Sequence, residues 1–234
     1  MTIWAILPAA GIGRRMGSAV PKQYLPLNGV PVITHSLQRL HAVQSIQKIV
    51  VVLHPEDSRW AALAPDQNSR ISCALGGDER YQSVLNGLEH LASEAADNDW
   101  VLVHDAVRPC VRTGDIEKLI TELSGDAVGG LLGSPVDNTL KQVDDGLCIT
   151  RTVDRRNLWN ALTPQMFRYS ILKDAINRVV FDGTQITDEA SAVELLGHKP
   201  RIIEGSKDNI KITHADDLVL ASKILESQAV NHEY

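Results

Sequence analysis

The sequence is poor in aromatic residues and cysteine and has no long apolar stretch, and each shortage excludes a class of protein. Aromatic residues make up only 4% of the chain while 44% of it is hydrophobic, which predicts an aliphatic core. The cysteines, Cys73, Cys110 and Cys148, are far apart and form no C-x-x-C pair. This spacing favours reduced thiols over a zinc or redox centre. No run approaches the roughly 20 apolar residues that a membrane helix needs.

An excess of positive charge is missing as well. The formal net charge is −6, whereas a nucleic-acid-binding surface is usually basic. The N-terminus lacks the basic segment and long apolar run of a secretory signal. We therefore expect a cytoplasmic protein with neither a nucleic-acid nor a membrane partner.

Aliphatic runs alternate with amphipathic stretches along most of the chain. Such alternation predicts a largely parallel sheet covered by helices on both faces, the α/β arrangement known as Rossmann-like. A length of 234 residues suits one such domain or two small ones, and we predict a single domain over residues 1–234. The predicted strands are residues 3–7, 49–53, 71–75, 101–104, 127–132 and 201–204. The predicted helices are residues 32–41, 80–96, 115–123, 168–180 and 215–228.

One segment interrupts this alternation. Residues 139–143 and 147–153 have strand character and flank the turn Asp144-Asp145-Gly146. They predict a β-hairpin arm within residues 135–157. Because an isolated hairpin is marginal in water, this one should lie on another surface, either within its own chain or on a second subunit.

The loop after the first predicted strand suits a phosphate ligand. Small residues at Ala9, Ala10 and Gly11 let an anion approach the backbone, and Arg15 and Lys22 supply positive charge. The loop is not a Walker A motif, because no Gly-Lys-Ser/Thr follows it, and its glycine spacing is not that of a dinucleotide fingerprint. The alternative is a surface turn with solvated arginines.

Other strand ends carry polar residues that should meet at the same edge of a parallel sheet. Gly77, Asp78 and Ser83 suggest a base- and ribose-binding edge, or simply a loop and a helix cap. Asp105 suits a magnesium ligand, or else pairs with Arg108. Its neighbour His104 is interpreted as structural rather than as a general base.

Two later segments add further candidates. Asp208 is a possible second metal ligand and Lys211 a possible phosphate contact, although a charged loop is usually just solvated. Thr187 precedes a stretch that also fits an ordinary helix start.

Taken together, these blocks resemble the 2-C-methyl-D-erythritol 4-phosphate cytidylyltransferases of the non-mevalonate isoprenoid pathway. The resemblance covers about residues 3–225. It is most specific in the Thr-Asp-Glu-Ala-Ser block at 187–191 and the Asp-Asn-Ile-Lys block at 208–211. It implies that the phosphate of methylerythritol phosphate attacks the α-phosphorus of CTP and that pyrophosphate leaves, with Mg²⁺ bridging the triphosphate.

The resemblance also implies roles for particular residues. Arg15 and Lys22 would stabilise the charge that develops on the phosphates, with Lys211 and Arg155 also catalytic. The implied nucleotide contacts are Ala9, Ala10, Gly11, Gly77, Asp78, Ser83, Asp105 and Ala106. The implied acceptor contacts are Asp105, Arg108, Thr139, Arg155, Thr163, Thr187 and Lys211, and Asp105 and Asp208 would hold the metal.

In this family the hairpin arm crosses to a second subunit and completes its site. The resemblance therefore implies a C₂ homodimer in which Thr139 and Arg155 serve the partner. Two alternatives remain at this point. One is another nucleotidyltransferase of the same architecture, such as a ribitol-5-phosphate cytidylyltransferase, and the other is a nucleotide-binding regulatory module without turnover.

Overall fold

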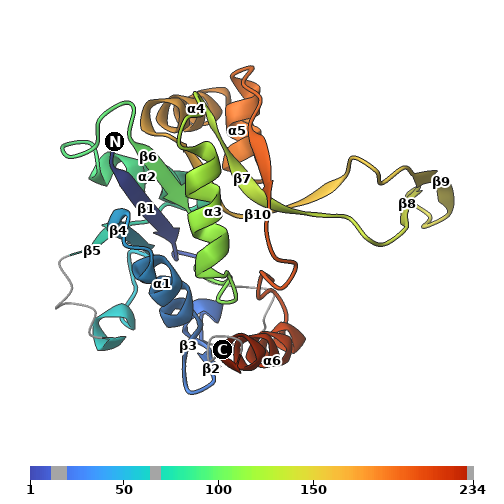
Figure 1. Ribbon diagram of the computed structural model, residues 1–234, viewed down its shortest axis with the longest axis horizontal. Coiled ribbons are helices and arrows are strands. Elements are labelled where there is room, and N and C mark those ends of the chain that lie inside the picture. Colours follow the sequence, from blue (N-terminus) through green and yellow to red (C-terminus); the bar gives the residue numbers. More distant parts are fainter. Residues whose placement is uncertain (12–19, 64–69, 231–234) are drawn as a thin grey trace.

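A seven-stranded sheet forms the centre of the protein. The structure, a computed structural model, describes residues 1–11, 20–63 and 70–230. Within these residues the strand order is β11-β7-β10-β6-β1-β4-β5 (Figure 1). The strands run as β1 Ile3–Pro8, β4 Ile46–Leu53, β5 Ile71–Leu75, β6 Trp100–Val103, β7 Gly129–Pro135, β10 Trp159–Arg168 and β11 Arg201–Glu204. Every predicted strand is present, and the predicted α/β fold with a largely parallel sheet is confirmed.

Strand β10 is the exception to the parallel arrangement, and it was not among the predicted strands. It pairs antiparallel with β6 on one side and with β7 on the other. Pro164 lies inside β10, and its pairing register to β7 shifts between Ala161 and Gln165. A proline inside a stretch argues against a central strand, because it lacks the N–H that a ladder needs. The register shift is where the strand accommodates it.

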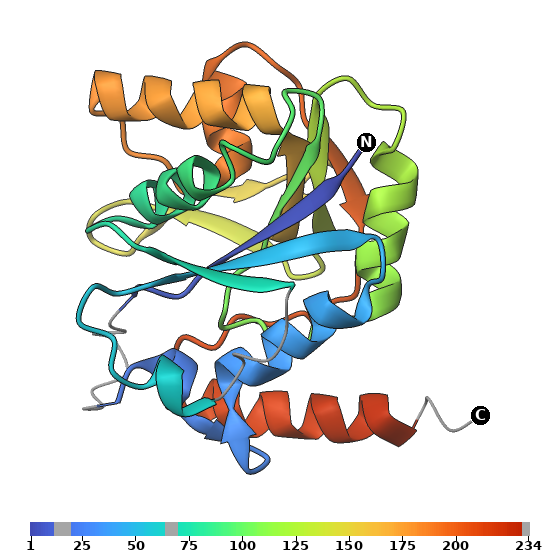
Figure 2. The same cartoon turned by 90° about the vertical axis from the view of Figure 1, so that its left-hand side faces the viewer.

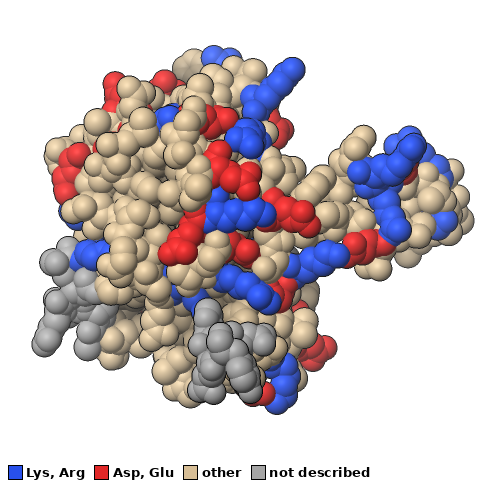
Figure 3. Space-filling model, viewed as in Figure 1, with Lys and Arg blue, Asp and Glu red and all other residues tan. Residues whose placement is uncertain are grey.

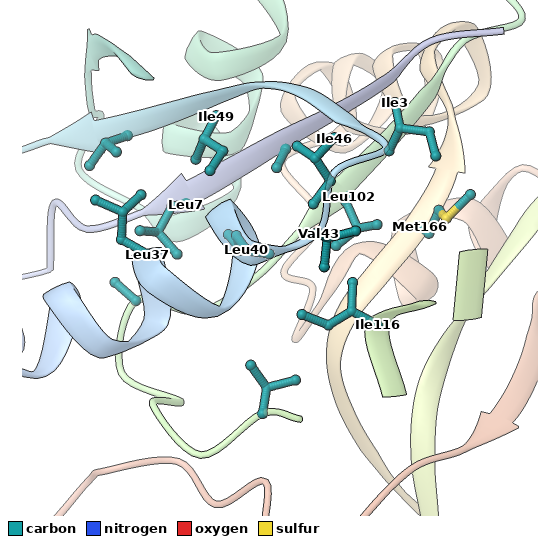
Figure 4. Packing of buried hydrophobic residues seen from close by; sticks show 14 of the residues in the cluster. Ile3, Leu7, Leu37, Leu40, Val43, Ile46, Ile49, Leu102, Ile116 and Met166 are labelled. Atoms are coloured by element: carbon teal, nitrogen blue, oxygen red, sulfur yellow. The ribbon is translucent and has the colours of Figure 1, made fainter. Parts of the chain in front are cut away.

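Helices cover both faces of the sheet, as Figure 2 shows. Helices α1 (Val32–Ala42) and α3 (Thr113–Leu123) pack on one face, where Leu40, Ile49 and Leu102 are among the buried residues (Figure 4). Helices α2 (Arg80–His90), α4 (Tyr169–Asp182) and α5 (Glu189–Leu195) pack on the other, around residues such as Phe167. Alternate residues of β1 enter the two cores, as the period of a strand requires.

The C-terminal helix α6 (Ala215–Val230) lies beside a two-stranded ribbon formed by β2 (Pro26–Leu27) and β3 (Val30–Pro31). A third, smaller apolar cluster includes Leu27, Ile212 and Leu225 and fixes α6 and the loop that precedes it. This loop follows β11 and carries Lys211, so α6 holds one part of the site described below.

The hairpin arm is present and stands clear of the rest of the chain (Figure 1). Its strands β8 (Leu140–Val143) and β9 (Ile149–Val153) pair with each other in a separate sheet. Leu147 is 81% exposed at the tip and Ile149 is 64% exposed, an unusual exposure for large apolar side chains. Across the described part of the chain, no helix is both long and apolar enough to cross a membrane.

Candidate active site

The carboxyl ends of β1, β5 and β6 meet at one edge of the sheet, because these strands are parallel. Strand β11 is also parallel to its neighbour β7, and the loop that follows it reaches the same edge. A cavity of about 160 Å³ lies there. Its lining includes the predicted residues Ala9, Ala10, Gly11, Lys22, Gly77, Asp78, Ser83, Asp105, Ala106 and Lys211.

Close packing between two loops shapes this cavity. A Cβ atom at Gly76 would lie 2.4 Å from the Cβ of Ala10 and 2.9 Å from Ser83 Oγ, so only glycine fits between them. The buried hydroxyl of Ser83 accepts a hydrogen bond from the Gly77 N–H at 3.2 Å. Gln23 Nε2 donates to the Ala9 carbonyl at 2.7 Å and holds the first loop in place. The cavity walls are thus fixed by contacts between distant segments.

Lys22 approaches the cavity from the 3-10 helix η2 (Lys22–Tyr24). Its Nζ donates to the carbonyl of Ile212 at 3.4 Å, which brings η2 next to the loop that carries Lys211. Two lysines from opposite ends of the chain therefore line one cavity.

Asp105 is the centre of the charged network. Its Oδ1 accepts a hydrogen bond from Arg80 Nε at 3.0 Å, and its Oδ2 lies 2.8 Å from Lys211 Nζ and 3.5 Å from Arg108 Nε. Burial opposes the charged form, but Arg80, Lys211 and Arg108 outweigh it and hold the pKa of this carboxyl far below its usual range. Asp105 is therefore ionised throughout the physiological range.

Arg80 is shared with a second carboxylate, that of Glu189. Nη1 donates to Glu189 Oε1 at 2.6 Å, and Nη2 donates to Oε2 at 3.0 Å. Burial works against the guanidinium charge, yet Glu189 and Asp105 outweigh it and raise the pKa of Arg80. Three cations, Arg80, Arg108 and Lys211, thus face two carboxylates. This network of five groups retains one positive charge, and its cations, together with Lys22, can meet an anionic ligand.

A second cavity, of about 190 Å³, shares Arg80, Asp105 and Lys211 with the first. Arg108, Thr163 and Thr187 also line it, so the structure brings the predicted acceptor contacts of the body together. Because β10 runs antiparallel, the first half of that strand carries Thr163 to this edge. The two cavities lie on either side of the Arg80–Asp105 pair.

The Thr163 hydroxyl is already engaged within the protein. It accepts a hydrogen bond from the Asp105 N–H at 3.2 Å and lies 2.9 Å from His104 Nδ1, while His104 Nε2 lies 3.1 Å from the Arg108 carbonyl. These partners require a neutral imidazole that carries its proton on Nε2. Burial lowers the pKa of His104 to about 4. Both ring nitrogens are occupied, which agrees with the structural interpretation of this histidine.

Some predicted residues are not brought to the cavities. Among the described residues, the linings include Asp105 but not Asp208, whose Oδ2 accepts hydrogen bonds from Arg112 and Gln228 instead. Thr139 and Arg155 belong to the arm and are exposed, and neither residue lines the two cavities. Arg15 lies outside the described residues.

The metal ligands expected at Asp105 and Asp208 both have basic partners in the structure. Within residues 1–11, 20–63 and 70–230, no three His, Cys, Asp or Glu side chains gather as metal ligands. Asp105 faces three cations, and Asp208 Oδ2 pairs with Arg112, while the buried Asp208 Oδ1 has no hydrogen-bond partner in the described part of the chain. The role of Asp105 and Asp208 as magnesium ligands stays a prediction.

Sequence reasoning missed the pair formed by Arg80, which is partly buried, and Glu189, which is fully buried. Arg80 was noted only within a motif, and Glu189 was interpreted as part of a helix start. Gln165 was also missed, although it is 1% exposed and donates to Asp188 Oδ2 at 2.8 Å. A buried charged residue must be paired with an opposite charge, and this rule could have pointed to the pair. The sequence does not show which charged residues are buried, however.

An α/β sheet whose strand ends gather small-residue loops and several cations defines a nucleotidyltransferase-type enzyme. Comparison with known proteins makes the class specific. The family described as 2-C-methyl-D-erythritol 4-phosphate cytidylyltransferase matches residues 3–227. The chain belongs to this family.

Individual relatives are similar in sequence to nearly the whole chain. A 2-C-methyl-D-erythritol 4-phosphate cytidylyltransferase of Hahella chejuensis is 48% identical over 223 residues, which cover 95% of this chain and 92% of the relative. One of Aliivibrio fischeri is 45% identical over 97% of this chain and 94% of its own. The crystal structure of the Francisella tularensis protein of the same name is similar with a TM-score of 0.82 at 34% identity, covering 96% and 100% of the two chains.

Proposed function

We propose that this enzyme transfers CMP from CTP to 2-C-methyl-D-erythritol 4-phosphate and releases pyrophosphate, in isoprenoid precursor biosynthesis. The observation that carries the proposal is the pair of adjoining cavities, one lined by the predicted nucleotide contacts and the other by the predicted acceptor contacts. Membership of the cytidylyltransferase family supports it.

The first cavity is proposed to bind CTP. Its small residues, Ala9, Ala10 and Gly11, leave room for the nucleotide beside the backbone, and we place the cytosine and ribose near Gly77, Asp78 and Ser83 of the same lining. Lys22 lies within reach of the phosphates from the same cavity. Its ammonium would stabilise the charge that grows on the leaving pyrophosphate, as we also propose for Arg15.

The second cavity is proposed to bind the acceptor. Arg108 and Lys211 supply positive charge, and Thr163 and Thr187 add polar contacts. A phosphate oxygen of the acceptor attacks the α-phosphorus of CTP, one P–O bond forms, and the bond to the β-phosphate breaks. Because a phosphate monoester is already ionised at neutral pH, with a second pKa near about 6, the attack needs no general base. A neutral, fully engaged His104 is consistent with such a step.

Positioning and charge therefore carry the catalysis. The three cations around Asp105 are held by ion pairs before any ligand arrives. Since the carboxylate of Asp105 already pairs with these cations, we propose that magnesium enters with CTP as part of the substrate, bound by phosphate oxygens.

We also propose a homodimer in which each arm completes the partner's acceptor cavity through Thr139 and Arg155. The exposed apolar residues Leu147 and Ile149 on the arm support this, because they would gain from a covering surface. The face of the arm in view in Figure 3 carries basic side chains, which suit a phosphate ligand. The single-domain organisation and the cytoplasmic location remain predictions.

Pyrophosphate release tests the function directly. The purified protein is incubated with CTP, magnesium and either 2-C-methyl-D-erythritol 4-phosphate or ribitol 5-phosphate. We expect turnover with the first acceptor to be faster. Faster turnover with ribitol 5-phosphate would reject the acceptor, and CTP binding without turnover on any acceptor would reject the enzyme in favour of a nucleotide-binding module.

A further inference from the structure

Glu189 is a buried carboxylate for which the proposed mechanism has no role. It is 0% exposed, and among the described residues it is absent from the linings of both cavities. A buried carboxylate is unfavourable unless it is paired and hydrogen-bonded. Its partner is Arg80, which meets it through two hydrogen bonds of 2.6 and 3.0 Å. Its function must therefore be exerted through Arg80.

Arg80 in turn reaches the carboxylate of the site through its Nε. Both of its Nη groups face Glu189, and its Nε donates to Asp105 Oδ1 at 3.0 Å. A bidentate contact fixes the plane of a guanidinium group, so Glu189 sets the direction of the Nε–H bond. That bond holds Oδ1 and leaves Asp105 Oδ2 facing Lys211 and Arg108.

We propose that Glu189 is a positioning residue of the active site. Through Arg80 it orients Asp105, and Asp105 then places the cationic groups of Lys211 and Arg108 where the acceptor phosphate binds. It also balances the charge of Arg80, so that Asp105 keeps its attraction for the other two cations. The inference rests on the proposed function, because the acceptor phosphate belongs to that reaction.

Helix α5 does not depend on Glu189 for its own placement. Asp188 and Ser191 form a capping box at the start of the helix. Gln165 of β10 holds the same turn from the side, since it donates to Asp188 Oδ2 and accepts a hydrogen bond from the Ala190 N–H, both at 2.8 Å. Loss of the charge at Glu189 should therefore leave the helix in position while it changes the orientation of Arg80.

The test compares Glu189→Gln with Glu194→Gln, an exposed glutamate on the same helix. In steady-state kinetics, Glu189→Gln should raise the KM for 2-C-methyl-D-erythritol 4-phosphate and lower kcat, each by about tenfold or more, because small displacements of reacting groups slow a reaction strongly. The Kd for CTP, measured by calorimetry, should change less than the acceptor KM, since only part of the network lines the nucleotide cavity and lining residues such as Ala9, Gly77 and Ser83 do not belong to it. Glu194→Gln should match the wild type. Identical acceptor kinetics in the two variants would overturn the proposal.

A double-mutant cycle separates a role through Arg80 from a general structural role. In an Arg80→Met background, Glu189→Gln should have no further effect on kcat/KM for the acceptor. If the double variant loses kcat/KM by the product of the losses in the two single variants, the proposal is overturned. If a single variant does not fold, as judged by circular dichroism, the Arg80→Met/Glu189→Gln variant decides, because it contains no unpaired buried charge. A wild-type acceptor KM in this variant would also overturn the proposal.

Failure of the proposed function would be visible separately, as a wild-type protein that does not transfer CMP. Binding of inorganic phosphate, measured by calorimetry, requires no turnover. Glu189→Gln should weaken it by about tenfold relative to Glu194→Gln, because the same two cations bind the anion. Equal phosphate affinities would overturn the inference even if the acceptor has been misassigned.

Discussion

The edge of the sheet and the hairpin arm both carry charged side chains, but they hold them in opposite ways. At the edge, Asp105 is 6% exposed and binds cations from three separate segments. On the arm, Arg156 pairs with Asp154 two residues away, and their side chains are 85% and 59% exposed. A buried network has a fixed geometry, whereas an exposed local pair contributes little.

This difference suggests that the two regions have different roles. The sheet edge is organised before a ligand arrives. The arm presents Arg155 and large apolar side chains to solvent, and a second surface is needed to give them a fixed place. Changes at the edge should therefore act within one chain, and changes on the arm should act on the partner.

The largest effect is expected at the edge, from Lys22→Ala. Because charge on the leaving pyrophosphate is greatest in the transition state, kcat should fall by about 10² to 10³-fold while the KM for CTP changes little. Pyrophosphate release measures both. Lys199→Ala, at an exposed lysine, is the matched control. A rise in KM with an unchanged kcat would contradict the catalytic role of Lys22.

On the arm, Arg155→Ala should raise the KM for the acceptor by about 10- to 100-fold, the usual effect of losing one charged hydrogen bond. The Kd for CTP should stay the same, because the nucleotide cavity belongs to the body. Arg156→Ala is the control, since its ion pair with Asp154 is solvent-exposed. Equal acceptor KM values in the two variants would remove Arg155 from the site.

The close packing of the edge predicts a cost for Gly76→Ala. The added methyl group would overlap Ala10 and Ser83, so the free energy of unfolding should fall by about 1–3 kcal/mol and CTP should stabilise the variant less. Gly114→Ala in α3, where a Cβ meets nothing within 4 Å, is the control. Urea unfolding with and without CTP gives both quantities. Unchanged stability of Gly76→Ala would mean that the two loops are not held rigidly.

The smallest effect is a pH dependence of stability from His104. Burial lowers the pKa of His104 to about 4 in the folded state, whereas an unfolded histidine has a pKa near about 6.5. The unfolded state then binds more protons between these values, so stability should fall as the pH falls from about 6.5 to 4, by up to about 1 kcal/mol per pH unit.

His104→Gln should abolish this slope, and His90→Gln, at an exposed histidine of α2, should retain it. Urea unfolding at several pH values measures the slope. The same slope in His104→Gln as in the wild type would place the responsible group elsewhere.

Much of the fold could be predicted from sequence because aliphatic runs and helical periodicity are local signals. The predictions for β5 and β11 match the observed bounds. Strand β10 escaped prediction because Pro164 and the polar Gln165 break its pattern, and the strand is stabilised by pairing to β6 and β7 and by burial of residues such as Phe167. Tertiary contacts determine that these residues form a strand, and such contacts cannot be seen in the sequence.

The candidate site also has a part that could be predicted from the sequence and a part that could not. Residues at strand ends, such as Ala9, Gly77 and Asp105, could be predicted to meet because parallel strands share one edge. The Glu189–Arg80 pair could not, since its members are more than a hundred residues apart and become partners only through burial. The partner of Asp208 could not be predicted either, because a charged loop gives no sign that Arg112 is its neighbour.

Mixed dimers test the division between edge and arm most directly. Lys22→Ala and Arg155→Ala proteins are unfolded together, refolded as an equal mixture and assayed for CMP transfer. If each site combines Lys22 of one chain with Arg155 of the other, half of the dimers carry one intact site, and activity should return to about a quarter of the wild-type level. Activity no higher than the average of the two variants refolded alone would contradict a shared site.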